Sequence, residues 1–121
     1  PTQWVETLSK SDSMFGSAMD WNEGFKKDYP SYTSVPYQSA QASAAVYVWK
    51  EGFEAANSFD KDTVRDAIAA VEMETFYGDI KFSEAGNNIA KPMFMRQIGA
   101  DGSYTLVESF DDVSFPRNVT Y

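Results

Sequence analysis

Paired carboxylates are the residues of this sequence whose spacing comes closest to a chemical site. Asp60 and Asp62 are spaced as at the start of a calcium-binding loop, but the glycine and the distal glutamate that such a loop needs are missing. Glu72 and Glu74 form a second pair, and two carboxylates facing each other across a sugar can hydrolyse a glycosidic bond. Spacing along the chain cannot show such opposed positions. We therefore interpret Asp60 as a helix cap and the two glutamates as the solvated end of a helix.

The 121-residue sequence contains neither cysteine nor histidine. This composition removes thiolate nucleophiles, disulfides, zinc-type metal sites and the commonest general base. Asp, Glu, Lys, Tyr and Ser remain, but no spacing groups them into a catalytic set. We therefore predict that the chain is not an enzyme and that it has no catalytic residues, no metal site and no cofactor.

The overall composition indicates a soluble globular chain that does not bind nucleic acid. Hydrophobic residues make up 43% of the sequence, charged residues 23% and aromatic residues 16%, which is enough apolar material for a domain with a core. The net charge is −8, and the 10 basic residues are scattered rather than clustered as phosphate recognition requires. We therefore expect no nucleic-acid partner.

The spacing of apolar residues predicts three helices. Apolar side chains recur every three or four residues within each of them, and Ser or Asp residues that can cap a helix precede the first and the third. The expected ranges are 14–29, 37–56 and 60–73, with residues 11–13 as caps of the first helix and Pro30 as its end. The second helix is apolar on most sides, so it should pack against more than one neighbour.

Short strands are expected to follow the helices, which makes the predicted fold class α/β. The expected strands are 74–77, 79–82, 93–98 and 104–107, separated by turns rich in Gly, Asn and Asp. The residues Met93 to Met95 we interpret as the core of a strand, with a soft partner-binding patch as the alternative.

Several stretches, in this order, resemble one protein family. Residues 75–88 resemble its signature of threonine-tyrosine-glycine-proline-isoleucine-phenylalanine, aspartate and glycine-asparagine, with Asp79 where proline is usual. Residues 62–68 resemble its valine-arginine-aspartate-alanine-leucine helix. The series is completed by residues 2–5, 30–32, 36–40, Gln97 and 101–104. On these residues the chain is similar to the C-terminal portion of a type I periplasmic solute-binding protein, of the branched-chain amino-acid and amide ABC importer family.

The resemblance implies both an architecture and a role. Residues 1–121 would be a single C-terminal fragment of a longer, two-lobed type I fold, contributing elements to both lobes. The intact protein would be the substrate-binding component of an ABC importer for branched-chain amino acids or related small polar solutes. Its partners would be that small-molecule ligand, an amino acid or an amide, and the ABC permease subunits. Its location would be the periplasm, or outside the cytoplasmic membrane on a lipid anchor.

Two residues are candidates for contact with the ligand. Trp4 follows the crossover between lobes that the resemblance implies, so it could line the cleft; core or hinge packing is the alternative. Tyr37 stands at the start of the second helix and could offer its hydroxyl to a ligand, with packing of the helix start as the alternative. In the family, the residues that grip the ligand usually lie upstream of this region, so we expect the chain alone to bind weakly.

A different class of function is also consistent with the sequence. The chain could be a self-associating α+β interaction module, or a sensory ligand-binding module without a transport role. The apolar second helix would then be buried by a second copy in a homodimer. The loops 31–36 and 86–92 could act as hinges for the exchange of an element between copies.

Overall fold

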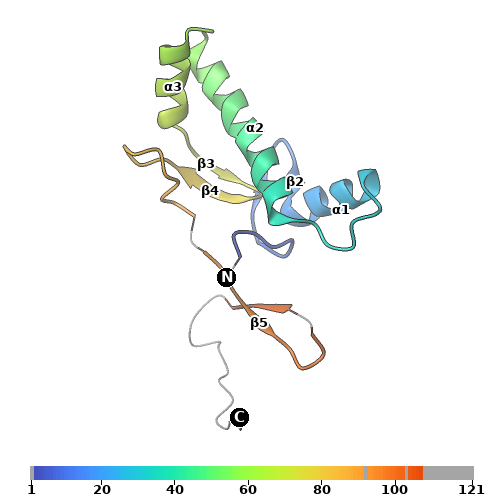
Figure 1. Cartoon of the computed structure of the whole chain (residues 1–121). Coiled ribbons are helices and arrows are strands. Elements are labelled where there is room, and N and C mark those ends of the chain that lie inside the picture. The colour runs from blue at the N-terminus through green and yellow to red at the C-terminus, as the bar shows by residue number, and fades with distance from the viewer. Residues whose placement is uncertain (1, 92, 103, 108–121) are drawn as a thin grey trace. The chain divides into compact units, whose positions relative to one another are not determined.

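A computed structural model describes residues 2–91, 93–102 and 104–107 of the chain (Figure 1). The chain forms two compact units: the larger comprises Trp4–Pro92, and the smaller comprises Pro1–Gln3 together with Met93–Tyr121. The chain therefore passes between the units twice, after residue 3 and after residue 92. Ser103 of the expected turn and the tail at 108–121 lie outside the described residues.

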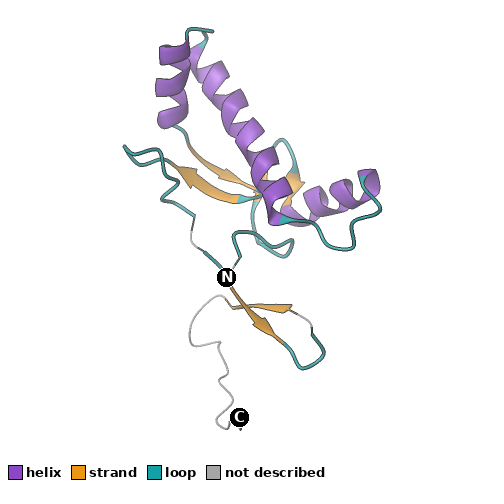
Figure 2. Cartoon of the chain, viewed as in Figure 1, coloured by secondary structure: helices purple, strands orange, loops and turns teal. Residues whose placement is uncertain are grey.

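The described residues form a mixed α/β structure of helices and short antiparallel strands, as predicted (Figure 2). The elements are, in chain order, β1 (Ser11–Asp12), β2 (Gly16–Ser17), α1 (Ala18–Asp28), α2 (Tyr37–Ala56), α3 (Lys61–Ala69), β3 (Glu72–Thr75), β4 (Gly78–Lys81), β5 (Met95–Ile98) and β6 (Tyr104–Val107). In the larger unit β1 pairs with β2 and β3 pairs with β4, whereas β5 pairs with β6 in the smaller unit.

The helix α1 begins at Ala18, later than the predicted start near residue 14. Residues 11–17 form the β1–β2 hairpin instead. The carboxylate of Asp12 holds the turn of this hairpin by accepting hydrogen bonds from the amides of Met14 and Phe15, at 2.9 and 2.7 Å. These local bonds from a side chain to the backbone override the apolar spacing that continues upstream of α1.

The N-cap of α1 is Ser17, so our assignment of the cap to residues 11–13 is wrong. The Ser17 hydroxyl accepts a hydrogen bond from the amide of Asp20 at 3.1 Å, and the Asp20 carboxylate accepts one from the amide of Ser17 at 2.8 Å. This reciprocal arrangement satisfies two amides that a helix start otherwise leaves unbonded. The same bonds lower the pKa of Asp20 below its usual value, the largest cause being the hydrogen bond from the Ser17 hydroxyl.

The helix α2 has the predicted bounds and packs against α3. Gly52 on α2 permits their close approach, because a Cβ at this position would collide with Cγ1 of Ile68 on α3. Asn57, in the left-handed conformation with φ 45°, ends α2. Asp60 caps α3 by accepting hydrogen bonds from two amides of its first turn. The interpretation of Asp60 as a cap is confirmed.

The helix α3 ends at Ala69, so the predicted end at residue 73 is wrong. After the helix, the strands β3 and β4 form an antiparallel hairpin whose two-residue turn is Phe76–Tyr77. The pairing starts with Thr75 opposite Gly78 and ends with Glu72 opposite Lys81. Both strands therefore lie nearer the N-terminus than the predicted 74–77 and 79–82. The apolar spacing of α3 continues into β3, and spacing cannot show where backbone pairing with a second strand begins.

The two glutamates lie in β3, not at the end of a helix. Glu72 pairs with Lys81 at 2.8 Å, and Glu74 pairs with Lys10 at 2.7 Å. Asp79, opposite Glu74 in the ladder, also binds the Lys10 ammonium at 2.8 Å. The hydrogen bonds to Asp79 and then to Glu74 raise the pKa of Lys10 above its usual value. The β1–β2 hairpin region is thereby tied to the β3–β4 hairpin.

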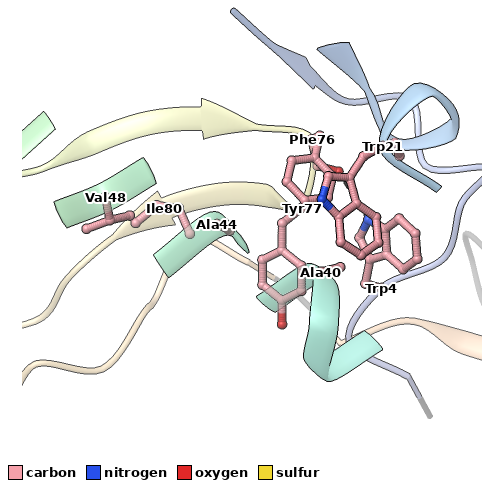
Figure 3. Packing of buried hydrophobic residues seen from close by; sticks show 9 residues of the cluster. Trp4, Trp21, Ala40, Ala44, Val48, Phe76, Tyr77 and Ile80 are labelled. Carbon is pink, nitrogen blue, oxygen red and sulfur yellow. Dashed lines mark hydrogen bonds between the residues drawn. The ribbon is translucent and has the colours of Figure 1, made fainter. Parts of the chain in front are cut away.

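An aromatic cluster around the β3–β4 turn forms the core of the larger unit (Figure 3). Phe76 is 0% exposed, and Trp21 of α1 stacks on it with 5.0 Å between the ring centroids. Trp4 meets both rings edge-on, with centroid distances of 5.4 Å to Trp21 and 6.3 Å to Phe76. Ala40 and Ala44 are buried in the same cluster, so their small side chains bring the backbone of α2 close to the turn.

The helix α2 packs against both this core and α3, as its apolar sides predicted. Part of its circumference stays open: Val46 is 64% exposed and Trp49 is 59% exposed. Large apolar groups exposed together on one helix indicate a surface that another element or molecule can cover.

In the smaller unit, Thr2 and Phe94 exchange two backbone hydrogen bonds. The Thr2 amide donates to the Phe94 carbonyl at 2.8 Å, and the Phe94 amide donates to the Thr2 carbonyl at 2.9 Å. The strand β5 begins at Met95 rather than at residue 93, whereas β6 has the predicted bounds. Met93 and Met95 are 58% and 44% exposed, so our interpretation of them as strand core is wrong.

Candidate ligand-binding site

Trp4, the first predicted ligand contact, lies in the core of the larger unit. It is 3% exposed, and its indole N–H donates a hydrogen bond to the carbonyl oxygen of Phe76 at 3.2 Å. This environment matches the packing role that we kept as the alternative, since a buried tryptophan usually finds a partner for its N–H. Little of the indole surface is left for a ligand in this chain. Trp4 as a ligand contact stays a prediction.

Tyr37, the second predicted ligand contact, is the first residue of α2 and is partly buried against the same core. The N-cap before it, Pro36, supplies no side-chain hydrogen bond to the first turn. The start of a helix carries a partial positive charge from its amide groups, which favours a nearby anionic group. Tyr37 therefore combines a hydroxyl with a helix start, and its contact with a ligand stays a prediction.

Tyr77, in the β3–β4 turn, is a neighbour of Tyr37 that the sequence did not single out. It is 4% exposed, and burial raises the pKa of its hydroxyl to about 12, with a smaller contribution from Tyr37. Figure 3 shows its ring beside Ala40, with the hydroxyl directed away from the stack of Phe76 and Trp21. At neutral pH this hydroxyl is uncharged and can both donate and accept a hydrogen bond.

Lys91, in the segment after β4, contacts the β3–β4 turn. Its ammonium is 4.1 Å from the centroid of the Tyr77 ring, within the range of a cation–π interaction. Its aliphatic stem lies over Gly78, where an added Cβ would come within 2.9 Å of Cε of Lys91. Gly78 has a φ of +129°, which residues with a side chain rarely adopt. Burial lowers the pKa of Lys91 to about 8.

The β3–β4 turn thus brings both predicted residues into one region of the larger unit. Trp4 bonds to Phe76, and Tyr37 packs against the core cluster that contains Tyr77. Two tyrosine hydroxyls and an ammonium suit a carboxylate or an amide, because hydroxyls supply hydrogen bonds and an ammonium attracts negative charge. The family-like stretch 75–88 was the signal that could have pointed to Tyr77, whereas Lys91 gave no signal, since its contacts arise only on folding.

Two hollows lie beside α2, and both are lined mainly by apolar side chains. The first, of about 230 Å³, is lined by Gln41, Ala44, Ala45, Val48, Trp49, Ile68, Tyr77, Ile80, Phe82 and Asn88. The second, of about 360 Å³, is lined by Trp49, Phe53, Phe59, Lys61, Val64, Arg65 and Ile68. Asn88 in the first hollow is already engaged, because its amide bonds the backbone of Lys81, Asp79 and Ala90. The hollows therefore suit apolar packing better than a polar solute.

The described part of the chain offers no metal centre: no three Asp, Glu, His or Cys side chains gather there as ligands would. Within the same residues, no helix has both the length and the apolar character that spanning a membrane requires.

A family model described as "Periplasmic binding protein" matches residues 2–103 of this chain. The match covers most of the chain, including both passages between the units, α1 to α3 and the β3–β4 turn. The chain therefore belongs to the periplasmic binding protein family, whose members bind solutes and are typically not enzymes.

Proposed function

We propose that this chain is the C-terminal part of a two-lobed solute receptor that serves an ABC importer. The ligand would be a branched-chain amino acid or a related small polar solute, held between the lobes in the periplasm. Closure around the ligand would present a surface to the permease subunits, and binding energy would shift an equilibrium between open and closed states without breaking a bond.

The family match over residues 2–103 carries this proposal. The division of the chain supports it further, because the C-terminal portion of such a receptor is expected to contribute elements to both lobes. Here the helices and the β3–β4 hairpin belong to one compact unit, and β5–β6 belong to another. We assign the larger unit to one lobe and the smaller unit to the other.

The ligand contacts that we propose in this chain surround the β3–β4 turn. Tyr37 is the foremost candidate, since it is the first residue of α2, is only partly buried and carries a hydroxyl. Tyr77 supplies a second hydroxyl, from the core cluster against which Tyr37 packs. Trp4 would act mainly by holding the turn through its bond to Phe76. Groups that grip the amino and carboxylate ends of an amino acid would come from upstream sequence.

Calorimetry with a panel of amino acids and amides tests the proposal. We expect the 121-residue chain alone to bind very weakly, because half a cleft cannot bury most of a ligand's surface. We expect a chain extended by its upstream coding sequence to bind one of these solutes tightly. An extended chain that binds none of them would refute the receptor assignment.

Substitutions in the extended chain locate the site. Tyr37→Phe removes one hydroxyl and should weaken binding by a factor of about 10 to 150, since a lost hydrogen bond to a charged group costs roughly 1.5–3 kcal/mol. Tyr32→Phe is the matched control, because Tyr32 is 47% exposed and lies on the loop before α2. Equal affinities of the Tyr37 variant and this control would remove Tyr37 from the site.

The self-associating module is a second candidate function, favoured by one observation. The two hollows share Trp49 and Ile68, and Trp49 is 59% exposed. An apolar surface of this kind can be covered by a second copy of the chain, which would make a homodimer.

A further inference from the structure

The second hollow beside α2 combines aromatic rings with two cations. Its volume of about 360 Å³ lies within the usual range of ligand pockets. Three of its residues form an aromatic row: Trp49 contacts Phe53 and Phe53 contacts Phe59, with ring centroids 5.8 and 5.9 Å apart. Because Trp49 is 59% and Phe59 95% exposed, an apolar group that covered the row would remove these rings from water.

The helix α3 supplies the cations of the hollow. Four of its residues line the hollow at spacings of three and four positions, which places them on one face of the helix: Lys61, Val64, Arg65 and Ile68. The carboxylates of Asp62 and Asp66 each follow a cation by one position, so they lie on an adjacent stripe and do not line the hollow. In the described part of the chain, this face of α3 therefore presents only positive and apolar groups. In a chain of net charge −8, such a face favours an anionic ligand.

The present partners of the two cations do not hold them firmly. The Lys61 ammonium pairs with Asp62 at 2.9 Å, and the Arg65 guanidinium pairs with Asp66 at 2.8 Å and with Asp62 at 3.3 Å. The Lys61 and Arg65 side chains are 85% and 67% exposed. Exposed ion pairs stabilise little, because water screens them and long side chains lose freedom in making them. An anion in the hollow can therefore replace or share these partners at a small cost.

We propose that this hollow binds an amphiphilic carboxylate, whose head group pairs with Lys61 and Arg65 and whose apolar tail covers the aromatic row. The tail can extend beyond the hollow, because Trp49 and Ile68 also line the neighbouring hollow of about 230 Å³. Ile68 lies about 10 Å along α3 from Lys61, so head and tail have separate places. None of the ligand contacts proposed around the β3–β4 turn lines this hollow, so the site goes beyond the receptor function and does not rest on it.

The indole N–H signals of the three tryptophans report binding in nuclear magnetic resonance spectra of the 121-residue chain. The probe is sodium decanoate, kept below the concentration at which it forms micelles. The Trp49 signal, assigned with Trp49→Phe, should shift in a saturable way. Trp4 and Trp21 are 3% and 8% exposed, so their signals should stay in place.

Two related probes separate the contributions of head and tail. Acetate has the head group of decanoate without its tail, and decyltrimethylammonium has the same tail with a cationic head. Both should bind at least about tenfold more weakly than decanoate, because each lacks one half of the recognition. Equal affinities for decanoate and decyltrimethylammonium would overturn the proposal. So would decanoate binding that leaves the Trp49 signal unmoved.

A double variant tests the cations. Lys61→Gln with Arg65→Gln should weaken decanoate binding about fivefold and should abolish the loss of affinity that added salt causes in the unaltered chain. Lys26→Gln with Lys27→Gln is the matched control, because it removes the same charge from the last turn of α1, outside the hollow. Amide spectra verify that each variant is folded. Equal affinities in the variant and this control would exclude the cations from the site.

A substitution in the aromatic row tests the tail. Phe59→Ala should weaken decanoate binding about tenfold, whereas Met19→Ala, at an exposed apolar residue of α1, should not change it. Sedimentation with and without decanoate tests a second copy as the occupant. A dimer that covers the aromatic row and that decanoate does not dissociate would overturn the proposal, as would equal affinities of Phe59→Ala and Met19→Ala.

Discussion

Two aromatic groups in the larger unit differ in what covers them. Around the β3–β4 turn, Trp4, Trp21 and Phe76 come from three distant parts of the sequence and are almost fully buried. Along α2 and the loop after it, Trp49 contacts Phe53 and Phe53 contacts Phe59, with ring centroids 5.8 and 5.9 Å apart. There Phe59 is 95% exposed.

The difference teaches that ring contacts do not by themselves make a core. The buried group (Trp4, Trp21 and Phe76) is enclosed by segments that are far apart in the sequence, so its rings are removed from water. The open group (Trp49, Phe53 and Phe59) comes from one continuous stretch of the sequence, and the described part of the chain does not cover it fully. The first group should therefore carry the stability of the chain, and the second should carry association.

The largest difference in the free energy of unfolding is expected between the variants Phe76→Ala and Phe59→Ala. Phe76 is 0% exposed, so its truncation should lower the free energy of unfolding by about 3–5 kcal/mol. Phe59 is 95% exposed, so its truncation should change that free energy by no more than about 0.5 kcal/mol. Denaturation by urea, followed by fluorescence, measures both. Similar losses in the two variants would mean that the open group belongs to the stable core.

A second contrast uses two glycines inside helices. Gly52→Ala should destabilise the chain by about 1–3 kcal/mol, because the added Cβ would collide with Ile68 between α2 and α3. Gly24→Ala should instead stabilise it by roughly 0.5–1 kcal/mol, because the added Cβ would meet nothing within 4 Å beyond its chain neighbours and the adjacent backbone of its own helix, and alanine favours a helix. Thermal denaturation decides the signs. Stabilisation by both substitutions would show that α3 does not pack closely on α2.

The sequence predicted the features that depend on neighbouring residues. The bounds of α2, the capping role of Asp60 and the range of β6 followed from apolar spacing and local chemistry. It missed the β1–β2 hairpin, because the apolar spacing upstream of α1 also fits a helix and does not reveal the local bonds of the Asp12 carboxylate that hold the turn. The same carboxylate also accepts a hydrogen bond from the Phe76 amide, 64 positions along the chain, which the sequence could not show either. It missed the end of α3 for a similar reason, since backbone pairing with β4 leaves no mark on apolar periodicity.

The residues of the candidate site also divide into those that the sequence could indicate and those that only the folded structure brings together. Tyr37 could be singled out because it begins a helix, which is a local property. Lys91 could not, since its burial and its cation–π contact exist only once the turn has folded against α2 and the segment after β4, whereas the family-like stretch 75–88 could have pointed to Tyr77. The roles of Trp4 and Tyr37 toward a ligand remain predictions for the calorimetric test.

The pH dependence of stability sharpens the role of Lys91. Burial lowers its pKa to about 8 from the ordinary 10.5, so between these values the unfolded chain binds a proton that the folded chain has released. The free energy of unfolding should therefore rise with pH across this window. Tyr77, whose ring faces the ammonium, has its pKa raised to about 12 from 10.0, which should lower stability above pH 10.

Urea denaturation at several pH values between 8 and 10 measures this contribution from Lys91. The rise should disappear in Lys91→Met and persist in Lys81→Met, which removes a lysine from the surface of β4. Parallel curves for the wild-type chain and Lys91→Met would show that the ammonium is hydrated in the folded chain and does not rest on Tyr77.

The smallest effect on the free energy of unfolding is expected for a substitution of Trp49. In the open group, we expect such a substitution to change self-association instead. Trp49→Glu should change the free energy of unfolding by at most about 0.5 kcal/mol, because the side chain is 59% exposed. If a second copy covers the hollows beside α2, the same substitution should weaken self-association about tenfold or more, since a buried tryptophan commonly dominates an interface.

Met19→Glu is the control, because Met19 is 40% exposed on α1 and lines neither hollow. Sedimentation at several concentrations separates the outcomes: a wild-type chain that stays monomeric throughout would end the homodimer hypothesis.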